Sequence, residues 1–326
     1  MKKIFITGGG GYVGSALADY LIDKGYFVSV FDLFIYGKDV FSSKKNINII
    51  QGDIRDKDLL RQSIKDHDVV IHLACISNDP SFELNPDLGK SINFDAFEPL
   101  VKISRDLGVK RFIYASSSSV YGIKDEKNVH EDMKLEPITD YSKFKMDCEI
   151  ILNNYKSEKF ITTTIRPATV CGYSKRQRLD VIVNILSNIG FHKREITIFG
   201  GNQLRPNIHI KDMIRAYETI IEADAAVING EIFNAGWENK SVKDIAESVK
   251  KILGEDIKLT VTPTDDNRSY HISSDKIKKK LNFNTKFTID DAVNDMKKAF
   301  QEKKLEDPLN NPNYFNIKKM QLIKLI

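Results

Sequence analysis

The stretch Thr7-Gly8-Gly9-Gly10-Gly11-Tyr12-Val13-Gly14 decides the fold. It follows the apolar run Lys3–Thr7, which predicts a β-strand, and it opens the helical pattern Tyr12–Lys24. Glycines at such a junction permit a tight turn and let the backbone approach a pyrophosphate at the N-terminus of the helix. The pattern therefore predicts a dinucleotide loop, with a plain turn between strand and helix as the alternative.

An acidic residue at the end of the next strand supports the dinucleotide interpretation. The second expected strand, Phe27–Asp32, ends in Asp32, which lies 18 residues after Gly14. This is close to the spacing of an acid that hydrogen-bonds a ribose 2′-hydroxyl. A carboxylate there would repel a 2′-phosphate, so the sequence favours NAD over NADP.

Two later strand ends fit the same cofactor. Gly52-Asp53-Ile54 follows the third expected strand, and its Asp can accept a hydrogen bond from an adenine amino group or merely cap the strand. His72-Leu73-Ala74 closes the fourth, where the small Ala74 either leaves room for a cofactor or packs in the core.

Short β-branched runs alternate with longer helical patterns through the first half of the chain. The expected strands are Lys3–Thr7, Phe27–Asp32, Asn46–Gln51, Val69–Ala74, Arg111–Ser116 and Phe160–Arg166. The expected helices are Tyr12–Lys24, Lys57–Lys65, Asn93–Leu107 and Asp140–Asn154. This alternation predicts an α/β fold with a Rossmann-type, doubly wound parallel sheet.

The regular alternation of strands and helices stops after Pro167, which indicates a smaller C-terminal substrate-binding lobe. There we expect a helix over Leu179–Ile189, a strand and helix over Ile208–Ile221, a strand over Glu231–Gly236 and a helix over Ser241–Leu253. We assign residues 1–171 to an NAD-binding domain with returning segments near 205–236. The remaining residues, 172–204 and 237–326, are assigned to the lobe.

Composition excludes several classes of protein. The 326 residues carry 49 Lys+Arg and 45 Asp+Glu, a net charge of +4 that is too small and too dispersed for a nucleic-acid surface. Three separate cysteines without a CxxC pair, and six histidines without HExxH spacing, indicate a reducing compartment and no metal site. No run approaches the roughly 18 apolar residues of a membrane span. A cytoplasmic enzyme or binding protein without membrane partners remains.

A possible proton-transfer site lies in the middle of the chain. Tyr141 and Lys145 are spaced i, i+4 on the expected helix Asp140–Asn154, and Ser116–Ser119 follows the fifth strand. Oxidation of a secondary alcohol requires a base for the hydroxyl proton and an acceptor for the hydride. A Tyr with an ordinary pKa of about 10 becomes a base when a Lys ammonium and a nicotinamide cation favour its phenolate.

Taken together, these motifs resemble the extended short-chain dehydrogenase/reductase family, and in particular its nucleotide-sugar epimerase/dehydratase branch. The resemblance spans about residues 1–300. The matching segments are TGGGGYVG at Thr7–Gly14, GD at Gly52–Asp53, HLA at His72–Ala74, SSSSVYG at Ser116–Gly122, YSKFK at Tyr141–Lys145, RPATVCG at Arg166–Gly172 and LRPNIHIKD at Leu204–Asp212.

The resemblance implies a role for each matching residue. Ser117, Tyr141 and Lys145 would be catalytic, with Tyr141 as the general base. The cofactor would contact Gly8, Gly11, Tyr12, Val13, Gly14, Asp32, Leu33, Asp53, Ile54, Leu73, Ala74, Asn93, Tyr141, Lys145 and Ala168. The substrate would contact Ser77, Ser117, Ser118, Thr169, Arg178, Asn184, Arg205 and Arg268. Among these, Asn184 and Arg268 also fit a helix surface and a solvated loop.

The implied activity is NAD-dependent oxidation at C4 of a nucleotide-diphosphate sugar to a 4-keto sugar, by a homodimer. If the 4-keto sugar is released, the protein would be a 4-dehydrogenase. If the hydride returns to the other face of the keto sugar, it would be a C4 epimerase. Similarity to proteins of bacterial capsule and surface-sugar pathways implies a GDP-linked heptose or hexose. The alternatives are a keto-sugar reductase, a non-catalytic NAD-binding sensor and a 4,6-dehydratase. The last normally carries Asp-Glu where this chain has Ser118-Ser119.

Overall fold

The computed structural model describes residues 1–41, 46–124, 126, 128–264, 269 and 271–323. Its main body is a seven-stranded sheet in the order β10-β6-β5-β4-β1-β2-β3, in which every neighbouring pair is parallel. The strands are β1 (Lys3–Thr7), β2 (Phe27–Asp32), β3 (Ile47–Gln51), β4 (Val69–His72), β5 (Arg111–Ala115), β6 (Ile161–Pro167) and β10 (Glu231–Ala235). The predicted doubly wound sheet is confirmed.

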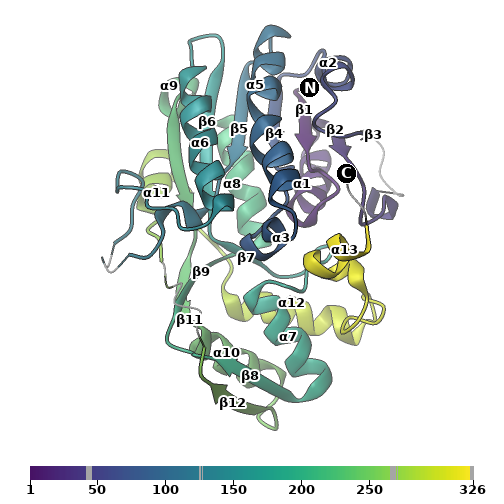
Figure 1. Cartoon of the computed structure of the whole chain (residues 1–326), viewed down its shortest axis with the longest axis vertical. Helices are drawn as coiled ribbons and strands as arrows, with labels where there is room; N and C mark the ends of the chain where they lie inside the picture. The colour runs from purple at the N-terminus through teal and green to yellow at the C-terminus, as the bar shows by residue number, and fades with distance from the viewer. Residues whose placement is uncertain (42–45, 125, 127, 265–268, 270, 324–326) are drawn as a thin grey trace.

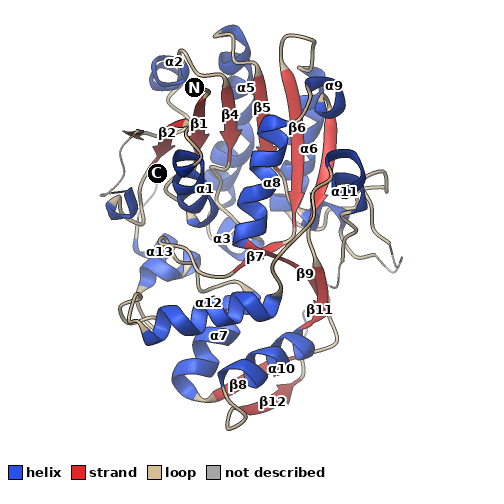
Figure 2. Cartoon of the chain, turned by 180° about the vertical axis from the view of Figure 1, so that it is seen from behind, coloured by secondary structure: helices blue, strands red, loops and turns tan. Residues whose placement is uncertain are grey.

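Helices cover both faces of this sheet (Figures 1 and 2). One face carries α1 (Tyr12–Asp23) and α8 (Ile210–Glu222), and the other carries α2 (Lys57–Ile64), α5 (Phe97–Asp106) and α6 (Asp140–Asn154). Successive side chains of a strand point to opposite faces of the sheet. Because helices cover both faces, the strands carry apolar side chains on both. In β1, Ile4 and Ile6 enter the first core and Phe5 enters the second.

The sheet has its switch point at β1. The chain proceeds outward from β1 through β2 to β3, then returns to β4 on the other side of β1. The connections after β1 and β4 therefore diverge, and a crevice opens at the carboxyl ends of these two strands. In open α/β sheets this is where ligands bind.

The smaller lobe lies below the carboxyl ends of the strands (Figures 1 and 2). It contains a three-stranded sheet, β11-β9-β7, and a parallel pair, β12-β8. These strands are β7 (Thr169–Cys171), β8 (Glu195–Phe199), β9 (Leu204–His209), β11 (Glu238–Ser241) and β12 (Lys258–Thr262). Three helices, α7 (Ile182–Lys193), α10 (Val242–Leu253) and α12 (Ile289–Gln301), pack around one apolar core. The domain boundaries expected from the sequence stay a prediction.

The remaining helices are short. They are α3 (Asp79–Glu83), α4 (Pro86–Lys90), α9 (Ala225–Ile228), α11 (Asp275–Leu281) and α13 (Asn316–Leu322). The last of these, drawn in yellow in Figure 1, contacts α3 beside the crevice. Within the described ranges, the structure contains no helix long and apolar enough to span a membrane.

Two expected helices differ from those observed. The helix expected over Asn93–Leu107 is split into a π-helical turn, Ser91–Asp95, and α5. Its Asn93 side chain turns inward and bonds both backbone polar groups of Ile76, at 2.8 and 3.0 Å. The helix expected from Leu179 begins at Ile182, because the Leu179 amide donates to the carbonyl of Tyr314 in the C-terminal segment.

His72 at the end of β4 is a buried, neutral link in the sheet. Its Nδ1 lies 2.7 Å from the Thr7 hydroxyl, and its ring stacks on Tyr114. Burial, together with the Lys145 ammonium, lowers the pKa of His72 to about 3.

We expect His72 to make the protein less stable in acid. The unfolded chain takes up a proton on His72 near pH 6.5, whereas the folded chain does not. The contribution of His72 to the free energy of unfolding is therefore complete above pH 6.5. Toward pH 3 this contribution falls by about 1.4 kcal/mol per pH unit. Urea unfolding at several pH values should show a shallower acid loss for His72→Gln than for the wild type. The exposed His130→Gln serves as the control. Equal slopes for His72→Gln and the wild type would show that His72 is protonated in the fold.

Candidate active site

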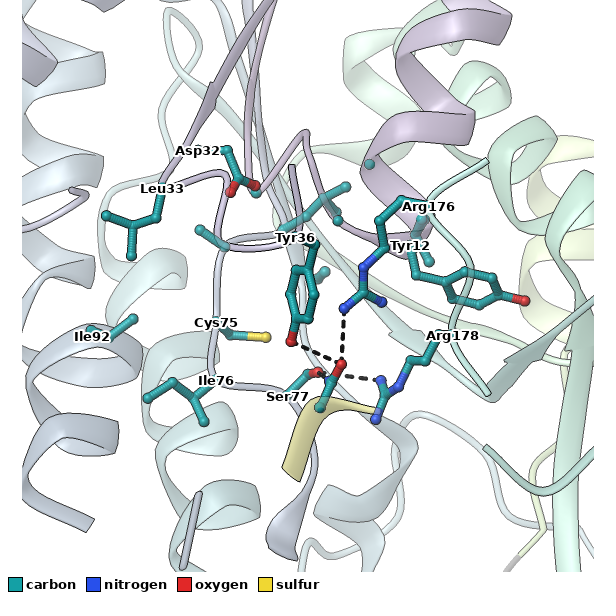
Figure 3. Close-up of a pocket in the computed structure, with 18 of the residues that line it drawn as sticks. Tyr12, Asp32, Leu33, Tyr36, Cys75, Ile76, Ser77, Ile92, Arg176 and Arg178 are labelled. Carbon is teal, nitrogen blue, oxygen red and sulfur yellow. Dashed lines mark hydrogen bonds between the residues drawn. The ribbon is translucent and has the colours of Figure 1, made fainter. Parts of the chain in front are cut away.

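The crevice is formed by the carboxyl ends of β1, β2, β4 and β5, the first residues of α1, the Tyr141–Lys145 face of α6, the loop 172–181 and α13. These segments are far apart in the sequence, and the parallel sheet brings them to one edge. Figure 3 shows the part of the wall that holds Asp32, Tyr36, Ser77 and the two arginines of the loop.

The glycine loop is shaped for close contact between backbone segments. Gly8 has φ +71°, and a Cβ on it would lie 2.5 Å from the backbone nitrogen of Ala74. A Cβ on Gly14 would overlap the carbonyl oxygen of Gly8. The start of α1 therefore sits against β1 and β4, with Gly8, Gly11 and Val13 lining the crevice. This cradle fits the pyrophosphate of a dinucleotide.

Asp32 lies at the end of β2 with its carboxylate fixed by the backbone. Its two oxygens accept hydrogen bonds from the amides of Gly10 at 3.0 Å and Phe34 at 2.7 Å. Burial raises the pKa of Asp32, while these amides and the nearby Arg176 act in the opposite direction. Each carboxylate oxygen has two lone pairs, so the group retains acceptor sites for ribose hydroxyls.

The other predicted cofactor residues fall into two groups. Leu33, Ile54, Leu73 and Ala74 line the crevice beside the glycine loop. Asp53, Asn93 and Ala168 are not among the lining residues in the described ranges. Asp53 pairs with Arg55 at 2.7 Å, Asn93 supports the backbone of Ile76, and Ala168 is buried between β6 and β7. The direct adenine contact proposed for Asp53 therefore stays a prediction.

The three predicted catalytic residues lie next to one another, but among the described residues only Tyr141 and Lys145 line the crevice. Tyr141 and Lys145 are both buried on α6 and line it. The Lys145 ammonium donates to the carbonyl of Ala115 at 2.7 Å and lies 5.8 Å from the centre of the Tyr141 ring. The Ser117 side chain interacts with the phenol and lies 2.8 Å from the hydroxyl of Ser119.

The charges around Tyr141 differ from the expectation. Burial raises the pKa of Tyr141 well above its ordinary value, and Cys75 and Asp79 act in the same direction. Arg178 and Ser117 oppose them. The expected lowering of this pKa by Lys145 does not dominate, because burial has the larger effect. In the chain by itself the phenol is neutral at pH 7.

A buried polar network fixes the catalytic segments relative to each other. Arg166 on β6 and Glu149 on α6 form an ion pair at 2.7 Å, both almost inaccessible to solvent. Ser116 donates a hydrogen bond to the same Glu149 carboxylate. At the start of α6, Thr139 caps the helix and donates to Asp79. The sequence did not identify Glu149 or Asp79, because their partners come from distant segments.

The predicted substrate residues are more dispersed. Arg178 and Ser77 line the crevice together, with the guanidinium donating to the Ser77 hydroxyl at 3.2 Å and to Asp180 at 2.6 Å. Asn184 is fully buried: it accepts from the Gly172 amide at 2.9 Å and contacts the Tyr12 hydroxyl at 3.1 Å. These contacts favour a structural role for Asn184.

Three further substrate candidates stay predictions. In the part of the chain that the structure describes, Ser118, Thr169 and Arg205 are not among the residues that line the crevice. Ser118 is buried in a 3₁₀ turn, Thr169 begins β7, and Arg205 donates to the carbonyl of Leu204. Arg268 lies outside the described residues.

The lining also contains residues that the sequence did not single out. Tyr36 follows β2, Arg176 belongs to the loop before α7, and Asn316 and Met320 belong to α13. The cation-rich segment Tyr173–Asp180, to which Arg176 belongs, predicts either a loop that binds the diphosphate or a charged sugar substituent, or a solvated loop. Asn316 carries no local signal, because it is brought to the crevice by the packing of a segment about 140 residues further along. The described residues hold no cluster of three or more His, Cys, Asp or Glu suited to a metal ion.

Comparison with known sequences agrees with this geometry. A family model described as "NAD dependent epimerase/dehydratase family" matches residues 4–236. The chain belongs to this family. Membership confirms the resemblance to nucleotide-sugar epimerases and dehydratases and identifies NAD as the cofactor.

The relatives share the fold over most of their length. A UDP-glucose 4-epimerase of Lactobacillus helveticus is 29% identical over 280 residues, which is 80% of this chain and 84% of the relative. A Thermotoga maritima UDP-glucose 4-epimerase structure, with UDP-glucose, has a TM-score of 0.83 at 26% identity, covering 92% of this chain and 99% of that one. A Bacillus cereus UDP-glucuronic acid 4-epimerase, in complex with UDP-glucuronic acid and NAD, has a TM-score of 0.82 at 26% identity and the same two coverages.

Asp32→Ala tests the ribose contact. Because hydrogen bonds to a charged group contribute about 1.5–3 kcal/mol, NAD binding should weaken about 10- to 100-fold, while NADP is no longer repelled. Dissociation constants for both dinucleotides, from titration calorimetry, measure the change. Asp58→Ala, at an exposed position on α2, is the matched control. An unaltered ratio of NAD to NADP affinity in Asp32→Ala would remove Asp32 from the ribose site.

Proposed function

We propose that the protein oxidises C4 of a nucleotide-diphosphate sugar to a 4-keto sugar. The observation that carries this proposal is that Tyr141 and Lys145 line the crevice that also holds the glycine loop and Asp32, while the Ser117 side chain contacts the Tyr141 phenol. A base, a cation and a hydroxyl thus converge where the family binds its cofactor.

The reaction removes one proton and one hydride from the sugar. Tyr141 takes the O4 proton, Ser117 orients the O4 hydroxyl, and Lys145 and Arg178 contribute the positive charge that favours the phenolate. When bound, NAD accepts the C4 hydride and adds the nicotinamide cation. Since burial raises the pKa of Tyr141, these cations determine whether the phenol can act as a base.

Two outcomes follow from the same oxidation. Return of the hydride to the opposite face of C4 gives an epimer, and release of the keto sugar makes the protein a 4-dehydrogenase. A 4,6-dehydratase requires an acid and a base after the catalytic hydroxyl. Ser118 is buried at that position, and Ser119 hydrogen-bonds Ser117. The proposal therefore excludes elimination of water as the main reaction.

We also propose the partners of this reaction. Arg178 and Ser77 are placed to hold the diphosphate of the sugar nucleotide, because an Arg fork pairs well with phosphate oxygens. The sequence resemblance favours a GDP-linked heptose or hexose of a surface-polysaccharide pathway, whereas the relatives named above are described as acting on UDP-linked sugars. The proposal includes a cytoplasmic homodimer.

Tyr141→Phe tests the base. Loss of general base catalysis should reduce turnover about 10²- to 10⁴-fold, while NAD binding and the thermal midpoint stay close to wild type. Steady-state kinetics with the best sugar nucleotide, combined with calorimetry for NAD, measure both. The control is Tyr155→Phe at the end of the same helix. Turnover of Tyr141→Phe at the wild-type level would contradict the assignment.

A panel of UDP-, GDP- and dTDP-linked sugars tests the reaction. Mass spectrometry of the products should show either the substrate mass with altered stereochemistry, for an epimerase, or a loss of two hydrogens, for a dehydrogenase. A product that has lost water would contradict the exclusion drawn from Ser118 and Ser119.

A further inference from the structure

Arg176 is a buried cation in the wall of the crevice. Its side chain is only 5% exposed, and its guanidinium carbon lies 3.5 Å from the centre of the Tyr36 ring (Figure 3). One nitrogen donates to the side-chain oxygen of Asn316 at 2.9 Å. Nε is buried without a hydrogen-bond partner among the described residues. The guanidinium therefore has unused donor capacity beside the crevice.

Among the described residues, no carboxylate is in direct contact with the Arg176 guanidinium. Within the described ranges it forms no ion pair, whereas its neighbours Lys175 and Arg178 pair with Asp19 and Asp180. Burial lowers the pKa of Arg176, while the carboxylates of Asp180 and Asp32 oppose this shift from a distance. A desolvated cation without a counter-ion in contact is costly. Such an arrangement indicates an anion supplied by a ligand.

The surroundings define the class of anion. Arg176 shares the crevice wall with Gly11 and Val13, at the N-terminus of the 12-residue helix α1. The free amides and dipole of a helix start favour negative charge, and an Arg fork binds two phosphate oxygens at once. Asp32 faces the same space, but its carboxylate is held by the Gly10 and Phe34 amides.

Asn316 fixes the arginine from the C-terminal segment. The residue is 5% exposed and its side-chain oxygen accepts from Arg176 and from the Tyr36 hydroxyl, each at 2.9 Å. Its side-chain nitrogen donates to Ser77 at 2.9 Å, and its backbone amide donates to Asp180 at 2.6 Å. One residue thus joins three segments of the wall and sets the direction of the guanidinium.

We propose that Arg176 binds the diphosphate of a ligand in the crevice, and that Asn316 is its positioning residue. Both NAD and a nucleotide sugar carry a diphosphate, so the chemistry is shared and the experiment separates the two sources. If the diphosphate is that of NAD, the inference rests on membership of the family. If it is that of a nucleotide sugar, the inference rests on the proposed function. Because binding is measured without turnover, its failure is distinguishable from a failure of the Tyr141 assignment.

The test compares Arg176→Met with Lys175→Met in the full-length protein stripped of bound dinucleotide. Lys175 is the adjacent cation, paired with Asp19 and about half exposed, so its loss is the matched control. Calorimetry with ADP-ribose, UDP and GDP should show a 10- to 100-fold loss of affinity for one class of diphosphate in Arg176→Met only. If only the affinity for ADP-ribose falls, Arg176 binds the diphosphate of the dinucleotide. If only the affinity for UDP or GDP falls, Arg176 binds the diphosphate of the sugar nucleotide.

Two further measurements separate binding from structure. Removal of a buried charge that has no counter-ion in contact should leave the ligand-free thermal midpoint unchanged or higher, whereas a structural arginine would lower it. Asn316→Ala should give a smaller loss of affinity for the same diphosphate, with the exposed Asn310→Ala as its control. If Arg176→Met does not fold, Arg176→Lys, which keeps the charge but not the fork, is used instead. Unchanged affinity for ADP-ribose, UDP and GDP in a folded Arg176 variant would overturn the proposal.

Discussion

The arrangement of the crevice follows from the close approach of two backbone segments. Gly8 lies so near the end of β4 that a Cβ would meet the backbone of Ala74, and Gly14 is pressed against the carbonyl of Gly8. Only glycine fits both positions. This contact places the start of α1 between the diverging ends of β1 and β4, so that its free amides face the crevice.

The residues that we propose as catalytic are held by a second set of contacts, on the other side of the crevice. Lys145 bonds the end of β5, and Glu149 joins Ser116 to Arg166 on the neighbouring strand. Because these partners are buried, α6 cannot shift without leaving charged groups unpaired, which is strongly unfavourable. The position of Tyr141 relative to the glycine loop is thereby set by the sheet itself.

The sequence predicted those features that depend on local pattern. The first six strands and the glycine loop were visible because apolar runs and glycine spacing are local properties. The helix expected over Asn93–Leu107 was wrong in its first turn, because Asn93 bonds a distant backbone segment. Arg176 and Asn316 were missed as a pair for the same reason. Their contact joins a loop to a segment about 140 residues away. The cationic run Lys175–Arg178 marks the loop, but Asn316 has no signal in its own neighbourhood.

The distribution of charge along the crevice connects structure to reaction. In the proposed assignment, Asp32 lies at the ribose end, the α1 terminus and Arg176 form the cationic middle, and Tyr141 lies at the reacting end. The central claim is that hydride leaves C4 of a nucleotide-linked sugar at this reacting end. The most direct measurement mixes the protein with a sugar nucleotide deuterated at C4, quenches the reaction during the first turnover, and analyses the enzyme-bound nicotinamide by mass spectrometry. We predict that the deuterium is found on the reduced nicotinamide ring. Reduction without label, or no reduction with any nucleotide sugar that binds, would contradict the account.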